Sequence, residues 1–425
     1  MKRWLILYED RHWRTLRPLT DLTPVPALTF GASNVAQRWR RATGIPLLSI
    51  EARRAPMAAW ADAPVMDEAG PRGEDEALVI NAAALPGPWI ADALAASSPA
   101  LFLGDGRVAG ARLPIAMISA GIGRGEDFET VLLGCALQAS SVDALFLSHA
   151  WDLIEENTDA IADDLAGSAA EHRGAIHRMA CLESPGHVHV AAGAVVEAFA
   201  VLDARGGPIR IGEGARIAAH TVVVGPCVIG PHTELLGGVV VRSTLGPQCR
   251  VAGEVEECVW QGYANKRHHG FVGHSVIGEW VNLGALTTTS DLKNNYGPVR
   301  VWVDGAEIDS GRSKVGSLIG AHVKTGIGTL LPTGASLGTG ANLFGGGRFA
   351  PKRVPSFGWW DGERMAEHEL DRFLITARTA MSRRGRALLP ADDALLRATF
   401  AATAAERGAR DTAPPVRVQD EGSHA

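Results

Sequence analysis

The sequence has no long apolar run, few cysteines and little net charge. None of its 425 residues lie in a stretch that approaches the ~18 apolar residues of a membrane-spanning helix, and the apolar run at 4–8 is shorter than the apolar region of a signal peptide. We therefore expect a cytoplasmic protein without a membrane partner. The five cysteines are scattered without C-x-x-C spacing, which favours reduced, buried thiols over disulfides or metal ligands.

Charge and composition exclude a further class. The formal net charge is −6, so the molecule as a whole does not attract nucleic acid, and we expect no nucleic-acid partner. Hydrophobic residues make up 46% of the chain and charged residues 21%, as in ordinary soluble proteins. The length is sufficient for two or three domains with a substantial core.

Residues 1–180 have the pattern of an α/β domain. Short apolar runs bounded by glycine, proline or charge lie at 4–8, 77–81, 100–104 and 113–119. Helical patterns follow at 126–142 and 152–165. Strands that alternate with helices predict a mainly parallel sheet.

Residues 186–347 carry a short repeat. Apolar residues recur every six positions at Ile211, Ile217, Val223, Ile229, Leu235 and Val241, again at Phe271, Ile277 and Leu283, and again at Ile319, Leu331, Leu337 and Leu343, with Thr325 in the missing slot. A six-residue period with glycine at the turns is typical of a parallel β-helix, in which three hexads close one triangular coil. We predict that these residues point into the shaft.

Two segments do not follow the repeat. Residues 289–314 interrupt it and predict a loop that extrudes from the shaft as part of a binding face. Residues 348–425 predict a C-terminal arm, with helices at 363–384 and 391–407 that cap the open end of the β-helix, and a disordered tail from 408.

Particular motifs resemble a known family. His268, the aromatic Phe271, "VNLGAL" at 281–286 and "NNYG" at 294–297 resemble the acetyltransferase half of the bifunctional N-acetylglucosamine-1-phosphate uridylyltransferase/glucosamine-1-phosphate acetyltransferase. At the front, "TLRPLTDLTPV" at 15–25 resembles the sugar-nucleotidyltransferase signature in degenerate form. The chain is identified as a member of a group of two-domain sugar nucleotidyltransferases similar to that enzyme. The resemblance implies a left-handed β-helix that assembles as a homotrimer, with sites between neighbouring shafts.

The resemblance also implies a chemistry. The β-helix would transfer an acyl group from acetyl-CoA, or another acyl-CoA, to a sugar phosphate, and the front domain would transfer a nucleotide to a sugar 1-phosphate with Mg²⁺. His268 is the candidate general base, because an imidazole suits proton transfer near neutral pH. The candidate substrate-binding residues are Lys266, Phe271, Asn282, Asn295 and Tyr296. The family has tyrosine where this chain has Phe271, so a hydrogen bond made by that hydroxyl is absent.

The front domain departs further from the family. The glycines that let the backbone approach phosphates are replaced, and Val25 stands in place of a lysine that meets phosphate charge. Nucleotidyl transfer is therefore predicted to be weakened or lost. Arg14 and Arg17 are candidates for compensating charge, with solvated or salt-bridged arginines as the alternative. Lys314 and Lys324 are candidates for coenzyme A phosphates, with solvated lysines as the alternative.

Other interpretations remain open from the sequence, two for particular residues and two for the whole protein. The histidine pair could form a polar corner of a coil, and Asn282 could belong to an asparagine ladder. The protein could be a non-catalytic scaffold trimer that binds a sugar nucleotide. A zinc hydrolyase of the β-helix carbonic anhydrase type would draw on His232, His268, His269 and His274, but no set of three fits both spacings, so we predict no metal site.

Overall fold

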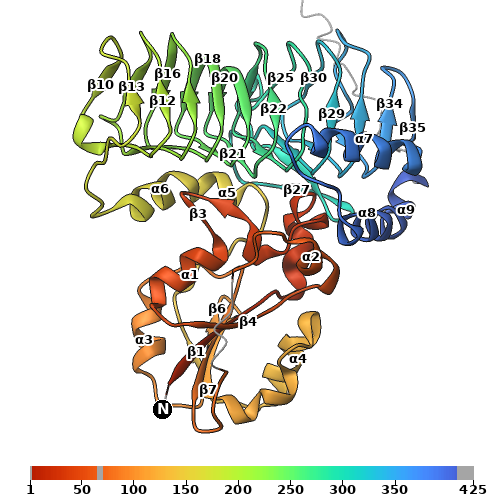
Figure 1. The fold of residues 1–425 in the computed structure, drawn as a ribbon. Helices are drawn as coiled ribbons and strands as arrows, with labels where there is room; N and C mark the ends of the chain where they lie inside the picture. The colour runs from red at the N-terminus through yellow and green to blue at the C-terminus, as the bar shows by residue number, and fades with distance from the viewer. Residues whose placement is uncertain (1, 65–69, 409–425) are drawn as a thin grey trace, which may run out of the picture.

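The computed structural model describes residues 2–64 and 70–408 and consists of a front domain, a long β-helix and a helical arm (Figure 1). The predicted fold class, an α/β nucleotidyltransferase-like front domain followed by a left-handed parallel β-helix, is confirmed. The predicted disordered tail begins at 408, and residues 409–425 lie outside the described residues. In the described parts of the chain, no helix is long and apolar enough to cross a membrane.

The front domain contains one mixed six-stranded sheet of order β4-β1-β5-β7-β6-β8. Its strands are β1 (Arg3–Tyr8), β4 (Leu47–Glu51), β5 (Glu76–Asn81), β6 (Ala100–Gly104), β7 (Arg107–Pro114) and β8 (Ala139–Ser141). Its helices are α1 (Val35–Thr43), α2 (Arg54–Ala59), α3 (Trp89–Ala95), α4 (Phe128–Gly134), α5 (Asp152–Glu155) and α6 (Asn157–Leu165).

The prediction of a mainly parallel sheet is confirmed, because β4, β1, β5, β6 and β8 all run in one direction and β7 runs antiparallel to its neighbours β5 and β6. One other expectation for this sheet was wrong. The apolar run at 113–119 is not a strand, because β7 ends at Pro114 and a 3₁₀ turn, Ile115–Met117, follows. A proline that lacks an N–H at the strand end explains the break.

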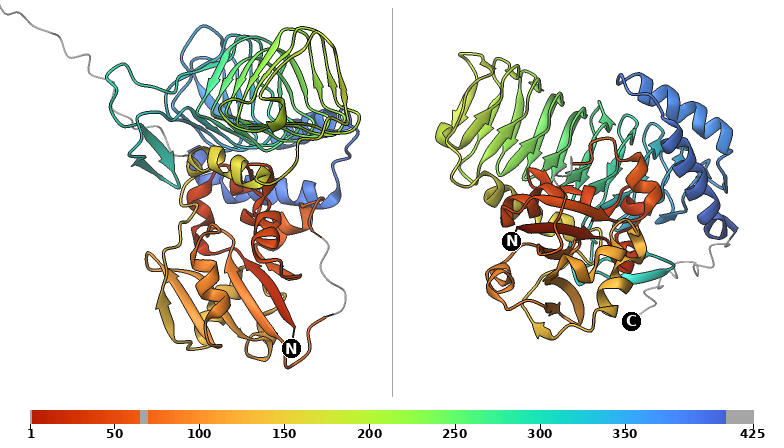
Figure 2. Two further views of the ribbon diagram at one scale, coloured as in Figure 1. Left: turned by 90° about the vertical axis from the view of Figure 1, so that its left-hand side faces the viewer. Right: turned by 60° about the horizontal axis from the view of Figure 1, so that its bottom comes forward.

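The β-helix has three flat sides. The first side carries the front domain, the second side carries the arm, and the third side carries neither. The first side contains β11 (Val188–Val190), β14 (Ile209–Ile211), β17 (Cys227–Ile229), β19 (Thr244–Leu245), β21 (Val259–Trp260), β24 (Val276–Ile277), β28 (Ser317–Ile319), β31 (Ala335–Leu337) and β33 (Arg353–Val354). All these pairings are parallel. Viewed along the shaft, the coils superimpose (Figure 2, left).

The second and third sides share two long strands, β18 (Glu234–Val241) and β20 (Arg250–Glu256), which turn the corner between them. The second side also contains β9 (Ala175–Ile176), β12 (Val195–Val196), β15 (Arg216–Ile217), β22 (Asn265–Lys266), β29 (Lys324–Thr325), β32 (Asn342–Leu343) and β34 (Gly358–Trp360). The third side also contains β10 (Cys181–Glu183), β13 (Val201–Asp203), β16 (Thr221–Val224), β23 (Phe271–Gly273), β25 (Thr288–Thr289) and β30 (Leu330–Leu331).

Most hexad residues point into the shaft as predicted, and two do not. Val240 and Val272 are buried where Val241 and Phe271 were expected. Leu235 and Val240 are five residues apart instead of six, and so are Val272 and Ile277. The corner between each pair is one residue shorter than the hexad repeat assumes, and a shift of one residue reverses which side chains of a strand face inward.

Strands of the β-helix extend from β9 to β34, beyond both ends of the predicted range 186–347. The first inward residues, Ile176 and Leu182, are only partly buried against the core. End coils have one neighbour instead of two, so their hexad pattern is weak and the boundaries of the domain were placed too far inward.

The segment 15–25, which resembles the sugar-nucleotidyltransferase signature, packs against the β-helix. Asp21 is buried and accepts hydrogen bonds from Thr339 Oγ1 at 3.0 Å and Ser356 Oγ at 3.2 Å. In the same interface, the side-chain amide of Gln261 bonds both the N–H and the carbonyl of Thr29, each at 2.9 Å. Val259, Val276 and Leu318 of the first side share one apolar core with the front domain.

The insertion and the arm also pack onto this junction. The insertion forms a hairpin of β26 (Arg300–Val303) and β27 (Ala306–Asp309), whose valines are buried in the core shared with the front domain. The arm consists of β35 (Met365–Glu367), α7 (Leu370–Ser382), α8 (Pro390–Ala402) and α9 (Ala404–Gly408). Strand β35 pairs with β34, so it covers the last strand edge, whereas α7 runs along the shaft and α8 lies near α2 (Figure 1).

Candidate functional site

His268 lies at the corner between the second and third sides. It follows β22 and precedes β23, and its side chain is exposed. The next coil is joined to this corner by a hydrogen bond from the N–H of Leu286 to the carbonyl of His269, at 2.9 Å. Leu286 and Ile327 on the following coils are 58% and 72% exposed, so two apolar side chains lie on the surface beside His268.

Lys266 lies inside the shaft, which corrects its predicted role as a cation for a sugar phosphate. Its side chain occupies the inward position next to Val251 and is 0% exposed. Nζ donates hydrogen bonds to the carbonyls of Ala252, at 3.0 Å, and His268, at 2.8 Å. Burial lowers the pKa of this ammonium to about 8. Lys266 therefore fixes the backbone of the histidine corner from within.

The charge buried at Lys266 predicts a pH-dependent stability. Below pH 8 both the folded and the unfolded protein carry it, whereas above pH 8 the folded protein loses the proton that the unfolded chain keeps up to 10.5. Stability therefore rises with pH in this window. For Lys266→Met, we expect the unfolding free energy relative to wild type to fall by roughly 2 kcal/mol between pH 7 and 10.5. Urea denaturation measures it, with exposed Lys314→Met as the control; a constant difference would contradict the assignment.

Asn282 and Lys324 lie on the second side, close to the histidine corner. Asn265, Asn282, Lys324 and Asn342 are register neighbours on successive coils. Asn265 Nδ2 donates to Asn282 Oδ1 at 2.8 Å, so the predicted asparagine ladder exists as a pair. Burial lowers the pKa of Lys324 to about 8. This row offers amide groups and a desolvated ammonium, which can bind hydroxyl and anionic groups.

The remaining predicted residues lie at the opposite edge of the third side. Asn295 and Tyr296 belong to the insertion, which leaves the shaft at the corner after the third side, and Tyr296 is 74% exposed. Lys314, where the insertion returns, is also exposed. One chain therefore does not bring these three residues to His268. Phe271 faces outward between the two groups.

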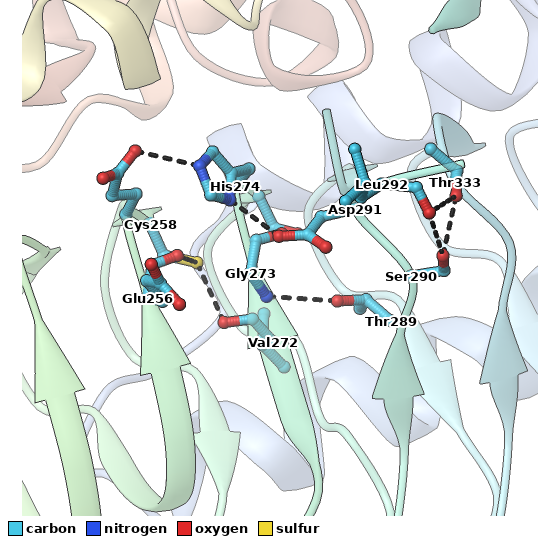
Figure 3. A network of polar contacts seen from close by, with 12 residues as sticks. Glu256, Cys258, Val272, Gly273, His274, Thr289, Ser290, Asp291, Leu292 and Thr333 are labelled. Atoms are coloured by element: carbon cyan, nitrogen blue, oxygen red, sulfur yellow. Dashed lines mark hydrogen bonds and ion pairs between the residues drawn. The ribbon is translucent and has the colours of Figure 1, made fainter. Parts of the chain in front are cut away.

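A charged cluster at that opposite corner was not predicted (Figure 3). His274 Nδ1 lies 2.7 Å from Asp291 Oδ2, and Nε2 lies 2.9 Å from Glu257 Oε2. Burial alone would lower the pKa of His274, but hydrogen bonds and charge from Asp291 and Glu257 raise it to about 9. The bond from His274 likewise lowers the pKa of Glu257 to about 2. A histidinium thus links two coils at the root of the insertion.

The front domain does not present its arginines to an open phosphate site. Arg17 pairs with Asp21 at 2.5 Å, with Glu406 at 2.7 Å and with Asp304 at 3.7 Å. Burial opposes its charge, but these carboxylates raise the pKa of Arg17. Arg14 is exposed, 5.1 Å from the ring of Trp13. The alternative prediction, salt-bridged or solvated arginines, describes both residues.

The carboxylate of Asp10, just after β1, already accepts hydrogen bonds from three protein donors. Asp10 accepts from the N–H of His12 at 3.0 Å, from Asn81 Nδ2 at 2.9 Å and from Arg107 at 2.8 Å. Mg²⁺ binds free carboxylate oxygens, and Asp10 offers none without breaking these bonds. The residues at this strand end therefore do not fit a Mg²⁺ site as they stand.

The candidate zinc ligands occupy different corners of the shaft. His232 lies between the first and second sides, His268 between the second and third, and His274 between the third and first. Within residues 2–64 and 70–408, no three histidine, cysteine, aspartate or glutamate side chains gather as a metal site would require. A single chain therefore does not assemble the imidazoles that the zinc interpretation needs.

Comparisons with known proteins agree with the resemblance. Residues 5–173 match the family model of sugar nucleotidyl transferases. A bifunctional sugar-1-phosphate nucleotidylyltransferase/acetyltransferase from Sulfurisphaera tokodaii is 41% identical over 93 residues, 22% of this chain and 23% of that protein. The bifunctional protein GlmU from Methanococcus vannielii is 30% identical over 129 residues, 30% of this chain and 26% of that protein. The chain thus spans about a quarter of the length of these relatives.

Among solved structures, a UDP-N-acetylglucosamine acyltransferase from Campylobacter jejuni matches 53% of this chain and 82% of its own, at 15% identity and a TM-score of 0.26. A TM-score this low does not establish a shared fold over the whole chain. The family match at the front and the relatives nevertheless confirm the resemblance drawn from the sequence: this chain is a two-domain protein with a sugar nucleotidyl transferase-like front, similar to bifunctional nucleotidylyltransferase/acetyltransferases.

Proposed function

We propose that this protein is a transferase of sugar-nucleotide metabolism whose β-helix moves an acyl group from a coenzyme A thioester to a sugar phosphate. The observation that carries the proposal is the exposed imidazole of His268 at a corner whose backbone is held by Lys266. The second side supplies Asn282 and Lys324 beside it. The relatives' acetyltransferase activity supports the choice of reaction.

The proposed step uses few groups. His268 takes the proton from the acceptor amine or hydroxyl while that atom's lone pair attacks the thioester carbonyl carbon. The carbon–sulfur bond then breaks, and the proton returns to the leaving thiolate of coenzyme A. Asn282 binds a sugar hydroxyl, and Lys324 lies close enough on the same side to meet a phosphate.

We also propose that the site is completed in a homotrimer. The exposed apolar side chains of Leu286 and Ile327 beside His268 give a neighbouring shaft a surface to cover. Asn295 and Tyr296 of that neighbour are then the residues available to face His268. A mass in solution equal to one chain would contradict this arrangement.

The front domain is proposed to have lost nucleotidyl transfer and to serve as a docking domain. Arg17 and Asp21 of the signature segment are used in the interface rather than for phosphate. A scaffold protein that binds a sugar nucleotide without turnover is the second candidate, favoured by the same contacts.

Two assays distinguish the acyltransferase from the sugar-nucleotide-binding scaffold. Wild-type protein is incubated with acetyl-CoA and a panel of amino-sugar 1-phosphates, and free thiol and product mass are followed. A second assay supplies nucleoside triphosphates and sugar 1-phosphates and measures pyrophosphate. We expect thiol release with an acylated product and no pyrophosphate. Stabilisation by nucleotides in thermal melting without either product would favour the scaffold.

A further inference from the structure

A cavity of about 250 Å³ lies where the front domain, the β-helix and the arm meet. Its β-helix wall is a corner at which one residue per coil has positive φ, including Tyr263 and Trp280. The rings of Tyr263 and Trp280 stack at 4.3 Å with an angle of 17°. We call these two residues the aromatic corner. No role in the proposed acyl transfer involves this cavity, which is a different corner from that of His268.

Glu279 has no partner in the cavity. It precedes Trp280, lines the cavity, and makes no side-chain hydrogen bond or ion pair with any residue in 2–64 or 70–408. Glu279 is half-buried, and no side-chain or backbone donor of the described residues satisfies its carboxylate, so a bound donor would supply a hydrogen bond that it lacks. The cavity therefore contains a hydrogen-bond acceptor with no donor in the described parts of the chain, the Glu279 carboxylate, next to an aromatic wall.

The other charges of the cavity leave it negative. Asp62, after α2, and Asp392, of α8, also line it, and Arg386 is the one cation among its lining residues. Arg386 is already engaged, because it bonds Tyr263 Oη at 2.8 Å and lies 3.6 Å from Asp62. An anionic ligand would meet three carboxylates, whereas a cation would be attracted by them. The faces of Trp280 lie against Tyr263 and His322, so the rings contribute an apolar wall and not a cation–π contact.

We infer that this cavity binds a small organic ammonium ion, with Glu279 accepting its N–H and the aromatic corner packing against its carbon skeleton. The ligand class follows from the unused carboxylate, the negative balance and the stacked rings. Because the three walls come from three parts of the chain, occupancy also holds the front domain and the arm on the shaft.

The inference predicts a pH dependence. Burial raises the pKa of Glu279 to about 7, Asp62 and Asp392 add to the shift, and Arg386 opposes it. The carboxylate is ionised above that pH, while an alkylammonium stays charged. Tyr263 also faces the site, and burial raises its pKa, so it remains neutral over this range. Affinity for the ammonium should therefore increase from pH 6 to pH 8.

Calorimetric titration of the full chain with benzylamine tests the inference, with benzyl alcohol as the uncharged probe of the same skeleton. We expect saturable binding of benzylamine alone, tighter at pH 8 than at pH 6. Glu279→Gln should weaken it about tenfold. Glu213→Gln is the matched control, since Glu213 holds the same place before the corner residue Gly214 but is exposed.

Three results would overturn the inference. These are no binding of benzylamine to wild type, equal binding of benzyl alcohol, or an unchanged affinity in Glu279→Gln. The pH series uses wild type only, so a poorly folded variant does not remove the test. None of these results depends on acyl-transfer activity, so they leave the proposed function to its own assays.

Discussion

His268→Ala should lower the turnover of acyl transfer about 100-fold or more while leaving the fold intact. The imidazole is exposed at its corner and makes no side-chain hydrogen bond within residues 2–64 and 70–408, so its removal costs little stability. The backbone of the corner does not depend on it either, because Lys266 holds the His268 carbonyl and Leu286 holds that of His269. The measurement is thiol release from acetyl-CoA at saturating acceptor.

His269→Ala is the matched control for this prediction. The two histidines are adjacent and both exposed, so the variants remove the same group from nearly the same place. We expect His269→Ala to keep turnover within about threefold of wild type, because a general base must reach the proton it takes. Equal losses in both variants, or full activity in His268→Ala, would remove His268 from the proposed step.

His274→Ala should lower the free energy of unfolding by roughly 3 kcal/mol at pH 6, because it leaves two facing carboxylates without their shared cation. Asp291 and Glu257 lie 2.7 and 2.9 Å from the two ring nitrogens, and the His274 side chain is 10% exposed. Arg242 remains beside Glu257 and compensates only that carboxylate. Urea denaturation of both proteins gives the difference.

The pH dependence of this difference has a definite sign. The folded pKa of His274 is raised from 6.5 to about 9, so its stabilisation is complete below pH 6.5 and is lost as the pH rises through 9. His232→Ala is the control, since His232 also has a positive φ, of 56°, at a shaft corner but is exposed. A loss of similar size in His232→Ala would assign the effect to the backbone instead of the ion pairs.

The hexad pattern predicted the shaft because burial acts on every coil in the same way. Ile211, Ile229, Ile319 and Leu337 all point inward, where each stacks on its counterpart in the next coil. The pattern failed at Val241 and Phe271, because the corners between Leu235 and Val240 and between Val272 and Ile277 are one residue shorter than the hexad repeat. Such local backbone geometry has no periodic signal.

Polar residues were harder to place than apolar ones. Lysine usually lies at the protein surface, and only the strand register that pairs Lys266 with Val251 shows that its side chain points inward. Arg17 and Asp21 resemble a nucleotide-binding signature, yet their partners Thr339 and Glu406 lie more than 300 residues away in the chain. Glu279 could have been flagged only by its position before an aromatic corner residue. Contacts of this kind follow from tertiary packing, which motifs do not encode.

The docking of the front domain decides where other copies of the chain can approach. A three-sided prism offers every side to a neighbour, and identical prisms that meet on all sides would extend into an open sheet. Here the first side is occupied by the molecule's own front domain, through Thr244, Val259 and Gln261. Lateral association is thereby confined to the other two sides, a geometry that favours a closed ring over unlimited growth.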